Sequence, residues 1–130
     1  MATGSSGRCE FEFQPFPVLL KYDCPHIEQR PYTLPASARK VNGHQPPCHE
    51  CHQTEENWVC LQQDCNLIGC SRYRLKHMLD HHSATNHSIC LSLSDHSIYC
   101  YVCEEYIDHS NFRQLHSQLI GEYGDQTFAA

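Results

Sequence analysis

Cysteine and histidine are unusually dense in this sequence, and many of them stand in close groups. The chain has 10 Cys and 11 His among 130 residues. Cys48 and Cys51 are separated by two residues, as are Cys100 and Cys103, so that both thiolates of each pair can reach one ion from a tight turn. This pattern favours a small fold that is stapled together by metal ions.

The expected compartment decides between metal sites and disulfides. Ten Cys in a secreted chain would indicate a disulfide framework, whereas a reducing compartment favours metal-bound or catalytic thiols. The start of the sequence, Met1 to Arg8, lacks the apolar segment of a signal peptide. We therefore expect an intracellular protein, cytoplasmic or nuclear, that binds zinc.

The charge and hydropathy of the chain exclude two classes of partner. The net charge is −6, which disfavours contact with a phosphate backbone, so no nucleic-acid partner is expected. No run approaches the roughly 20 apolar residues of a membrane span. A monomer that acts on neither nucleic acid nor membrane is expected.

Twelve residues are candidate zinc ligands, eight Cys and four His. Structural zinc takes four nitrogen or sulfur ligands, so twelve ligands predict three zinc ions per chain. Spacing alone leaves the pairing open, because His77 and His81 lie one helical turn apart and could share an ion. The candidates are Cys24, His26, Cys48, Cys51, Cys60, Cys65, Cys70, His77, His81, His87, Cys100 and Cys103.

One alternative is a DNA-binding finger. Cys60-x4-Cys65-x11-His77-x3-His81 comes within one residue of the Cys2His2 spacing. Cys70 would then fall inside the finger loop, and the chain is acidic, so we disfavour this interpretation.

The remaining thiols and imidazoles are expected to have no metal role. Cys9 and Cys90 fall outside the clusters and are interpreted as small buried hydrophobes. The remaining histidines are expected to be solvated or in loops: His44, His49, His52, His82, His96, His109 and His116. The alternative for His82 and His49 is that they lie close enough to ligands to support them or compete with them.

Sequence patterns predict an α+β fold. Residues 88–94 alternate polar and apolar side chains, which is typical of a half-buried strand, and after a turn at Asp95 and His96 a second strand is expected over 97–102. Alternation then places Tyr99 and Tyr101 on one face and Cys100 on the other. A further strand is expected over 57–61.

Two helices are expected, one over 74–82 and one over 111–123. The second has Phe112, Leu115, Leu119 and Ile120 at helical spacing. Residues 31–47 contain four Pro and a Gly, which indicate an irregular loop. An apolar stretch near the start is interpreted as an arm or an edge strand packed on the module: Phe11, Phe13, Phe16, Val18, Leu19 and Leu20.

Read together, these motifs resemble the ubiquitin-specific-protease-type zinc finger, ZnF-UBP or BUZ. Within that family the sequence is most similar to the C-terminal finger of cytoplasmic, ubiquitin-binding histone deacetylases. The residues that carry the resemblance are Cys24-Pro-His26, Cys48-x2-Cys51, Glu56-Asn-Trp-Val-Cys60, Gly-Cys70-Ser-Arg72-Tyr73, His77-Met-Leu-x-His81-His, His87 and Tyr99-Cys-Tyr101-x-Cys103.

The resemblance implies the zinc pairing that spacing leaves open. Cys24, His26, Cys100 and Cys103 would bind the first ion; Cys48, Cys51, Cys70 and His77 the second; Cys60, Cys65, His81 and His87 the third. It also implies a twisted sheet of about five strands with two helices. The domain would span residues 24–123, between an N-terminal arm over 1–23 and a tail over 124–130.

The resemblance further implies a site for the free C-terminal Gly-Gly tail of ubiquitin. Its residues would be Arg72, Tyr73, Tyr99, Tyr101, Glu104 and Tyr106. A Gly-Gly tail fits a narrow aromatic slot, and its carboxylate needs donors such as a guanidinium or a Tyr hydroxyl. Ser71 replaces a glycine that is common before the arginine, and Tyr99 stands where some relatives have Trp.

Two other functions are compatible with parts of this sequence. The first is a structural finger that docks a partner protein without binding ubiquitin, as an accessory domain of a deubiquitinase or deacetylase. The second is catalysis, which we do not expect of this chain, because nearly every clustered thiol is assigned to metal and no nucleophile–base pair remains.

Overall fold

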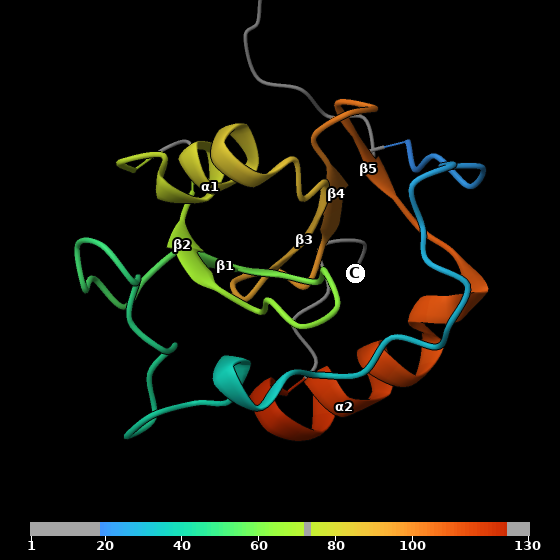
Figure 1. The fold of residues 1–130 in the computed structure, drawn as a ribbon. Helices are drawn as coiled ribbons and strands as arrows, with labels where there is room; N and C mark the ends of the chain where they lie inside the picture. Colours follow the sequence, from blue (N-terminus) through green and yellow to red (C-terminus); the bar gives the residue numbers. More distant parts are fainter. Residues whose placement is uncertain (1–18, 72–73, 125–130) are drawn as a thin grey trace, which may run out of the picture.

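The computed structural model describes residues 19–71 and 74–124. Five strands and two α-helices follow one another along the chain, with two short 3-10 helices, η1 and η2 (Figure 1). Their bounds are η1 Ala36–Ala38, β1 Asn57–Cys60, β2 Ile68–Cys70, α1 His77–Thr85, β3 Ile89–Ser92, β4 Ile98–Cys100, β5 Glu105–Ile107, η2 Ser110–Phe112 and α2 Arg113–Tyr123. The α+β class is confirmed.

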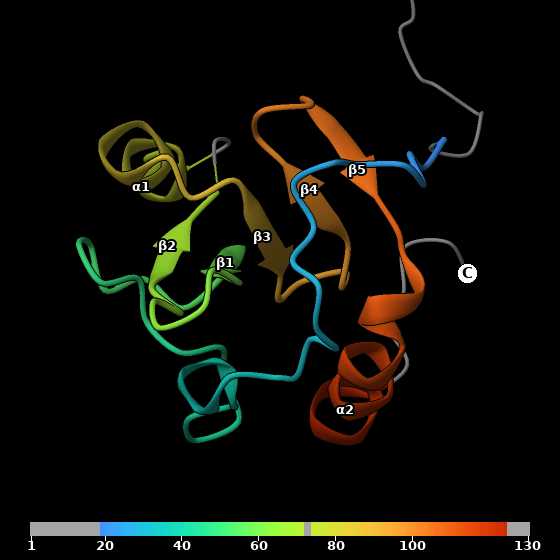
Figure 2. The ribbon, with the colours of Figure 1, turned by 45° about the vertical axis from the view of Figure 1, so that its right-hand side comes forward.

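The strands form one antiparallel sheet in the order β2-β1-β3-β4-β5. The two helices lie on opposite sides of it (Figures 1 and 2). Side chains alternate between the two faces as the pleat requires. Val59, Leu91 and Ile98 join the core beneath α2, whereas Cys60, Cys90 and Tyr99 pack with Met78 of α1.

The core beneath α2 is completed by the segment that precedes β1. Tyr32, Leu34 and Ala38 are buried there, and the Tyr32 ring lies 4.9 Å from that of Phe112. The Tyr123 hydroxyl donates to the carbonyl of Ala38 at 2.6 Å. This segment, coloured blue to cyan, runs beside α2 in both ribbon views (Figures 1 and 2).

The strands predicted from alternation are present but shorter than expected. The strand predicted over 57–61 is β1, and the predicted hairpin is β3–β4 with its turn at residues 93–95. Tyr101 lies outside β4, in a turn that leads to β5 and in which Glu104 has a φ of 55°. β2 and β5, three residues each, were not predicted from the pattern.

Both predicted helices are present, but their bounds differ. α1 begins at His77 and not at residue 74, because Lys76 has a left-handed backbone with φ 65°, and it continues to Thr85. Residues 111 and 112 belong to η2, so α2 begins at Arg113. Ile120 was expected on the buried stripe of α2, but its side chain is 45% exposed. Tyr123, one turn after Leu119, continues the buried stripe instead. Residues 31–47 are irregular apart from η1 and an isolated bridge.

Most of the predicted N-terminal arm lies outside the described residues, including Phe11, Phe13, Phe16 and Val18. Leu19, which is described, is 86% exposed. Lys21 extends the sheet by a parallel bridge to Ile107, and its amide donates to the carbonyl of Tyr106 at 2.9 Å. Within the described ranges, none of the helices is long and apolar enough to cross a bilayer.

Candidate metal centres and aromatic face

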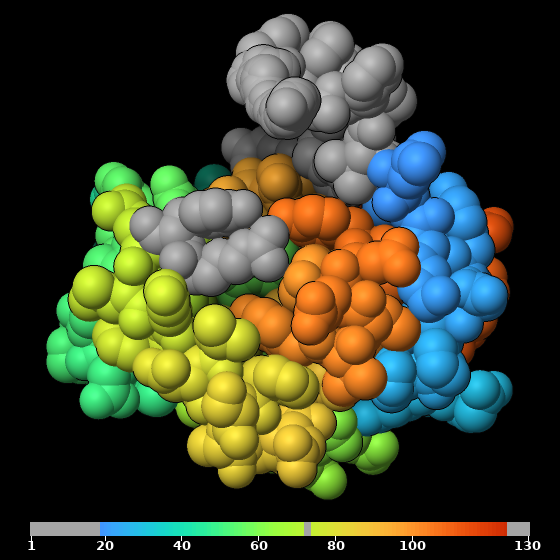
Figure 3. Space-filling view, turned by 90° about the horizontal axis from the view of Figure 1, so that it is seen from above, coloured from blue at the N-terminus to red at the C-terminus, as the bar shows by residue number. Residues whose placement is uncertain are grey.

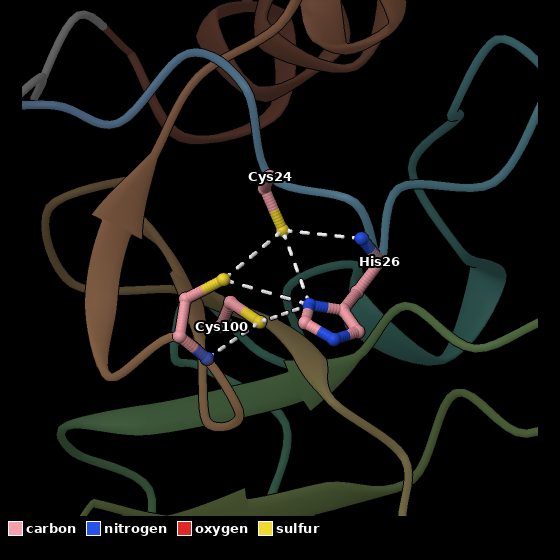
Figure 4. A group of neighbouring side chains, drawn as sticks. Cys24, His26 and Cys100 are labelled. Atoms are coloured by element: carbon pink, nitrogen blue, oxygen red, sulfur yellow. Dashed lines mark hydrogen bonds between the residues drawn. The ribbon is translucent and has the colours of Figure 1, made fainter.

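Group one ties the N-terminal segment to the β4–β5 hairpin. Its members are Cys24, His26, Cys100 and Cys103. The Nδ1 atom of His26 lies 3.6 Å from the Cys24 sulfur, 3.4 Å from that of Cys100 and 3.5 Å from that of Cys103. Figure 4 shows the Cys24 thiol and the His26 ring pointing toward Cys100, which stands at the end of β4.

Group two joins β2 to the first residue of α1. It contains Cys48, Cys51, Cys70 and His77. The sulfurs of Cys48 and Cys70 both lie 3.3 Å from Nδ1 of His77. The helix can approach β2 this closely because residue 69 is glycine, where a Cβ would stand 2.8 Å from the amide nitrogen of Met78.

Group three lies between the end of β1 and the middle of α1, with one ligand from the residues that follow α1. It contains Cys60, Cys65, His81 and His87. The Cys60 sulfur is 3.6 Å from Nδ1 of His87, and the Cys65 sulfur is 3.4 Å from Nε2 of His81. The two imidazole nitrogens are 3.2 Å apart.

These separations match a tetrahedral zinc site. Zinc–sulfur bonds of about 2.3 Å and zinc–nitrogen bonds of about 2.05 Å give tetrahedron edges of roughly 3.8 Å for S–S, 3.6 Å for S–N and 3.3 Å for N–N. The Cys24 and Cys103 sulfurs are 3.8 Å apart, far beyond the roughly 2.05 Å of a disulfide. In each group all four ligand atoms lie within 4.8 Å of one another. Each of the three groups could therefore hold one zinc ion.

The groups have the membership that the family resemblance implied. The nine Cys among the described residues are all free thiols, which excludes a disulfide framework in this part of the chain. The Cys2His2 alternative is wrong for the described geometry, because His77 and His81 belong to different groups.

Burial sets the proton affinity of several ligand atoms. It raises the pKa of Cys24 and of Cys60 to about 12, with neighbouring thiols as smaller causes in the same direction. At Cys48 the opposing amides of Cys51 and Glu50, with His77, outweigh burial and lower the pKa to about 6. Burial lowers the pKa of His81, which favours the neutral imidazole that zinc requires.

Four rings form a continuous aromatic row on the α1 face of the sheet: Tyr106, Tyr99, Tyr101 and His82. The Tyr99 centroid lies 5.2 Å from that of Tyr106 and 5.2 Å from that of Tyr101, both edge-on. Tyr99 and Tyr101 pack on this face, whereas Cys100 belongs to the opposite core, as strand alternation predicted. All four rings are half-buried.

The other residues expected at the ubiquitin site surround this row unevenly. Glu104 is exposed in the β4–β5 turn, where its amide donates to the carbonyl of Cys100 at 2.8 Å. Arg72 and Tyr73 lie outside the described residues. On one side of them Ser71 donates its amide to the carbonyl of Glu56, and on the other Arg74 binds the Glu55 carboxylate at 2.8 Å.

The predictions for the remaining Cys and His hold in part. Cys90 is buried beside Cys60, as expected of a small hydrophobe, and Cys9 lies outside the described residues. His44, His49 and His52 are exposed. His96 is a correction: it is 2% exposed, because the β3–β4 turn places it against the Tyr123 ring at 5.8 Å.

His109 and His116 are half-buried. The ring of His109 accepts a hydrogen bond from the amide of Asn111 at the start of η2. Among the described residues, sequence reasoning missed the contact of His82 with Tyr101, because no spacing rule relates these two residues.

A five-stranded sheet with a helix on each face and three Cys/His groups defines a zinc-finger module. Residues 48–112 match the family model zf-UBP, described as "Zn-finger in ubiquitin-hydrolases and other protein". The chain belongs to this family, and the resemblance found in its motifs is confirmed.

Several larger proteins contain a similar segment. The chain is 42% identical over 60 residues to NAD-dependent deacetylase sir2A of Dictyostelium discoideum, which covers 46% of this chain and 11% of that protein. It is 33% identical over 84 residues to histone deacetylase 6 of Caenorhabditis elegans, a match that covers 65% of this chain and 8% of that protein. It is 31% identical over 88 residues to ubiquitin carboxyl-terminal hydrolase 44 of Ailuropoda melanoleuca, a match that covers 68% of this chain and 12% of that protein. The chain thus spans about a tenth of the length of these relatives.

Proposed function

We propose that this module binds the free C-terminal Gly-Gly tail of ubiquitin at the aromatic row. One observation carries the proposal: Tyr99, Tyr101 and Tyr106 come from β4, the following turn and β5, and their rings converge on one half-buried face. Membership in a zinc-finger family described by its occurrence in ubiquitin hydrolases supports a ubiquitin partner.

The proposed site suits a thin peptide end. Glycine has no side chain, so aromatic walls can approach both sides of its backbone. Residues of α1 and of the β4–β5 hairpin lie side by side on the surface in Figure 3, coloured yellow and orange. The row runs from one to the other through the contact of His82 with Tyr101.

Charge completes the proposed recognition. The guanidinium of Arg72 would bind the terminal carboxylate, with Tyr73 as a further wall. Arg72 is two residues from the group-two ligand Cys70, and the described residues before and after the pair 72–73 have partners of their own: Ser71 binds Glu56 and Arg74 binds Glu55. Glu104 and the net charge of −6 suit the arginines that precede the glycines of ubiquitin.

Isothermal titration calorimetry tests the proposal. The zinc-loaded chain is expected to bind intact ubiquitin and not ubiquitin without its last two glycines. Arg72→Ala should weaken binding by about thirtyfold or more, because truncating one partner of a desolvated charge pair costs about 2–5 kcal/mol. Arg72→Lys should also weaken it, since a point charge cannot replace the planar fork.

Arg113→Ala is the matched control, since Arg113 is exposed at the start of α2 on the other side of the sheet. It should leave the affinity unchanged. Equal affinity of wild type and Arg72→Ala, at full zinc content, would show that the site is misplaced. No response to ubiquitin at all would instead favour a finger that docks another partner protein within a larger one.

A further inference from the structure

His82 has two contacts that together define the orientation of its ring. It follows the group-three ligand His81 in α1, and its ring is stacked on that of Tyr101 with centroids 4.9 Å apart and planes 16° from parallel. Its Nδ1–H donates to the backbone carbonyl of His87 at 2.9 Å. The stack fixes the plane of the ring, and the hydrogen bond fixes its rotation within that plane.

The orientation of the Tyr101 ring depends on neighbouring side chains more than that of the Tyr99 ring does. Tyr99 stands in the middle of β4 and is paired with Cys90 on one side and with Tyr106 on the other. Tyr101 is already in the turn beyond the strand, where its amide donates to the carbonyl of Ser88 at 2.9 Å. Its ring therefore needs side-chain contacts to keep one orientation.

Two of those contacts differ in kind. Tyr99 meets Tyr101 edge-on, with planes 80° apart, whereas His82 covers a face of the ring in a nearly parallel stack. The edge-on contact with Tyr99 limits how far the Tyr101 ring can move toward Tyr99. The parallel stack with His82 limits how far the Tyr101 ring can tilt. The two contacts therefore differ in geometry, and together they restrain the Tyr101 ring more than either would alone.

We infer that His82 is a positioning residue of the tail-binding site, which holds Tyr101 in the orientation that forms its wall. The inference rests on the proposed function and extends it by one residue on α1. It also links the site to group three, because the hydrogen bond that orients His82 is accepted by the backbone carbonyl of the ligand His87.

Three substitutions of His82 separate its two contacts. His82→Ala removes both, His82→Phe keeps a ring that can stack, and His82→Asn keeps a donor near the position of Nδ1. Aromatic pairing of this kind corresponds to about three- to tenfold in affinity. His82→Ala and His82→Asn should weaken binding of intact ubiquitin by that factor, whereas His82→Phe should stay within about twofold of wild type.

A double-mutant cycle with Tyr101→Ala distinguishes positioning from general stabilisation. If His82 acts through Tyr101, His82→Ala should change the affinity by less than about twofold in the Tyr101→Ala background. Native mass spectrometry should give the wild-type zinc content for each variant. His116→Ala, on the α2 side of the sheet, is the control that should not change the affinity.

The outcomes are separable. Equal fold-changes in the two backgrounds, or full affinity for His82→Asn with loss for His82→Phe, would overturn the inference. So would equal affinity of wild type and His82→Ala. Failure of the wild type itself to bind ubiquitin would overturn the proposed function as well, whereas the first three results leave that function standing.

Discussion

Gly69→Ala tests the packing on which two of the zinc groups depend. Gly69 lies in β2, next to Cys70 of group two, and directly faces the start of α1. A Cβ at this position would stand 2.8 Å from the nitrogen and 3.0 Å from the Cα of Met78, and 3.2 Å from the carbonyl carbon of His77. These are backbone atoms, so rotation of a side chain cannot relieve the contact.

The size of the effect follows from these distances. Non-bonded heavy atoms are at their optimum near 3.5–4.0 Å, so α1 would have to retreat by roughly half an ångström or more. Metal–ligand distances tolerate only about 0.2 Å, and α1 carries His77 of group two and His81 of group three. We expect a loss of about 1–3 kcal/mol, as for other overpacked cores, and a melting temperature lower by roughly 5–15 °C.

The loss of stability is measured by thermal unfolding followed by circular dichroism, and the weaker zinc binding by release of zinc to a chromophoric chelator. Two of three zincs should be released more readily, and the zinc of group one should not. Gly121→Ala is the control: Gly121 is in α2 with nothing within 4 Å of its Cβ position, so the same substitution should stabilise by up to about 1 kcal/mol. A Gly69→Ala protein with wild-type melting and zinc release would refute the reasoning.

Three further predictions concern the whole module. Native mass spectrometry should give three zincs per chain, and a strong chelator should unfold it, because the binding energy of structural zinc is largely folding energy. Burial raises the pKa of Tyr123 from 10.0 to about 12, so the unfolded state loses this proton first and stability should fall between pH 10 and 12; Tyr123→Phe should lack that part of the loss in urea titrations at pH 9 and 11. The Asn57 amide, fully buried, donates to the carbonyls of Pro46 and Gln53, so Asn57→Ala should cost about 1–3 kcal/mol in urea denaturation, whereas Gln114→Ala, exposed on α2, should be nearly neutral.

The sequence predicted best those elements whose patterns are long enough to repeat. Alternation over 88–94 identified β3, and the helical stripe with Phe112, Leu115 and Leu119 identified α2. β2 and β5 are too short to show a period, and they exist because the neighbouring strands pair with them. Only the family resemblance implied that the sheet would have about five strands.

Element ends were predicted less well, because they depend on contacts between distant residues. Lys76 adopts a left-handed backbone after a turn in which the amides of Arg74 and Lys76 both donate to the carbonyl of Ser71. The turn after Cys100 that brings Cys103 to group one takes Tyr101 out of the strand. The left-handed backbone at Lys76 has no local signature in the sequence, whereas the Cys100-x2-Cys103 spacing indicates the tight turn after Cys100 but not where β4 ends.

The ligand candidates could be identified from local spacing, whereas their grouping could not. His77 and His81 stand one helical turn apart, and a helix surface brings such residues together. In this structure the two histidines belong to different groups. His77 lies near Cys70 at the end of β2, whereas His81 faces Cys65 in the loop after β1. Only the resemblance implied this division, and the three-dimensional arrangement reproduces it.

The ligands of groups two and three interlace along the chain. Cys60 and Cys65 lie between the two halves of group two, while Cys70 and His77 lie between the two halves of group three. Closing either group shortens the free loop that the other must close, and the entropy of loop closure rises with loop length. The first closure therefore lowers the entropic cost of the second. Loading of these two sites should be cooperative although they share no ligand, and chains with only one of them filled should be scarce.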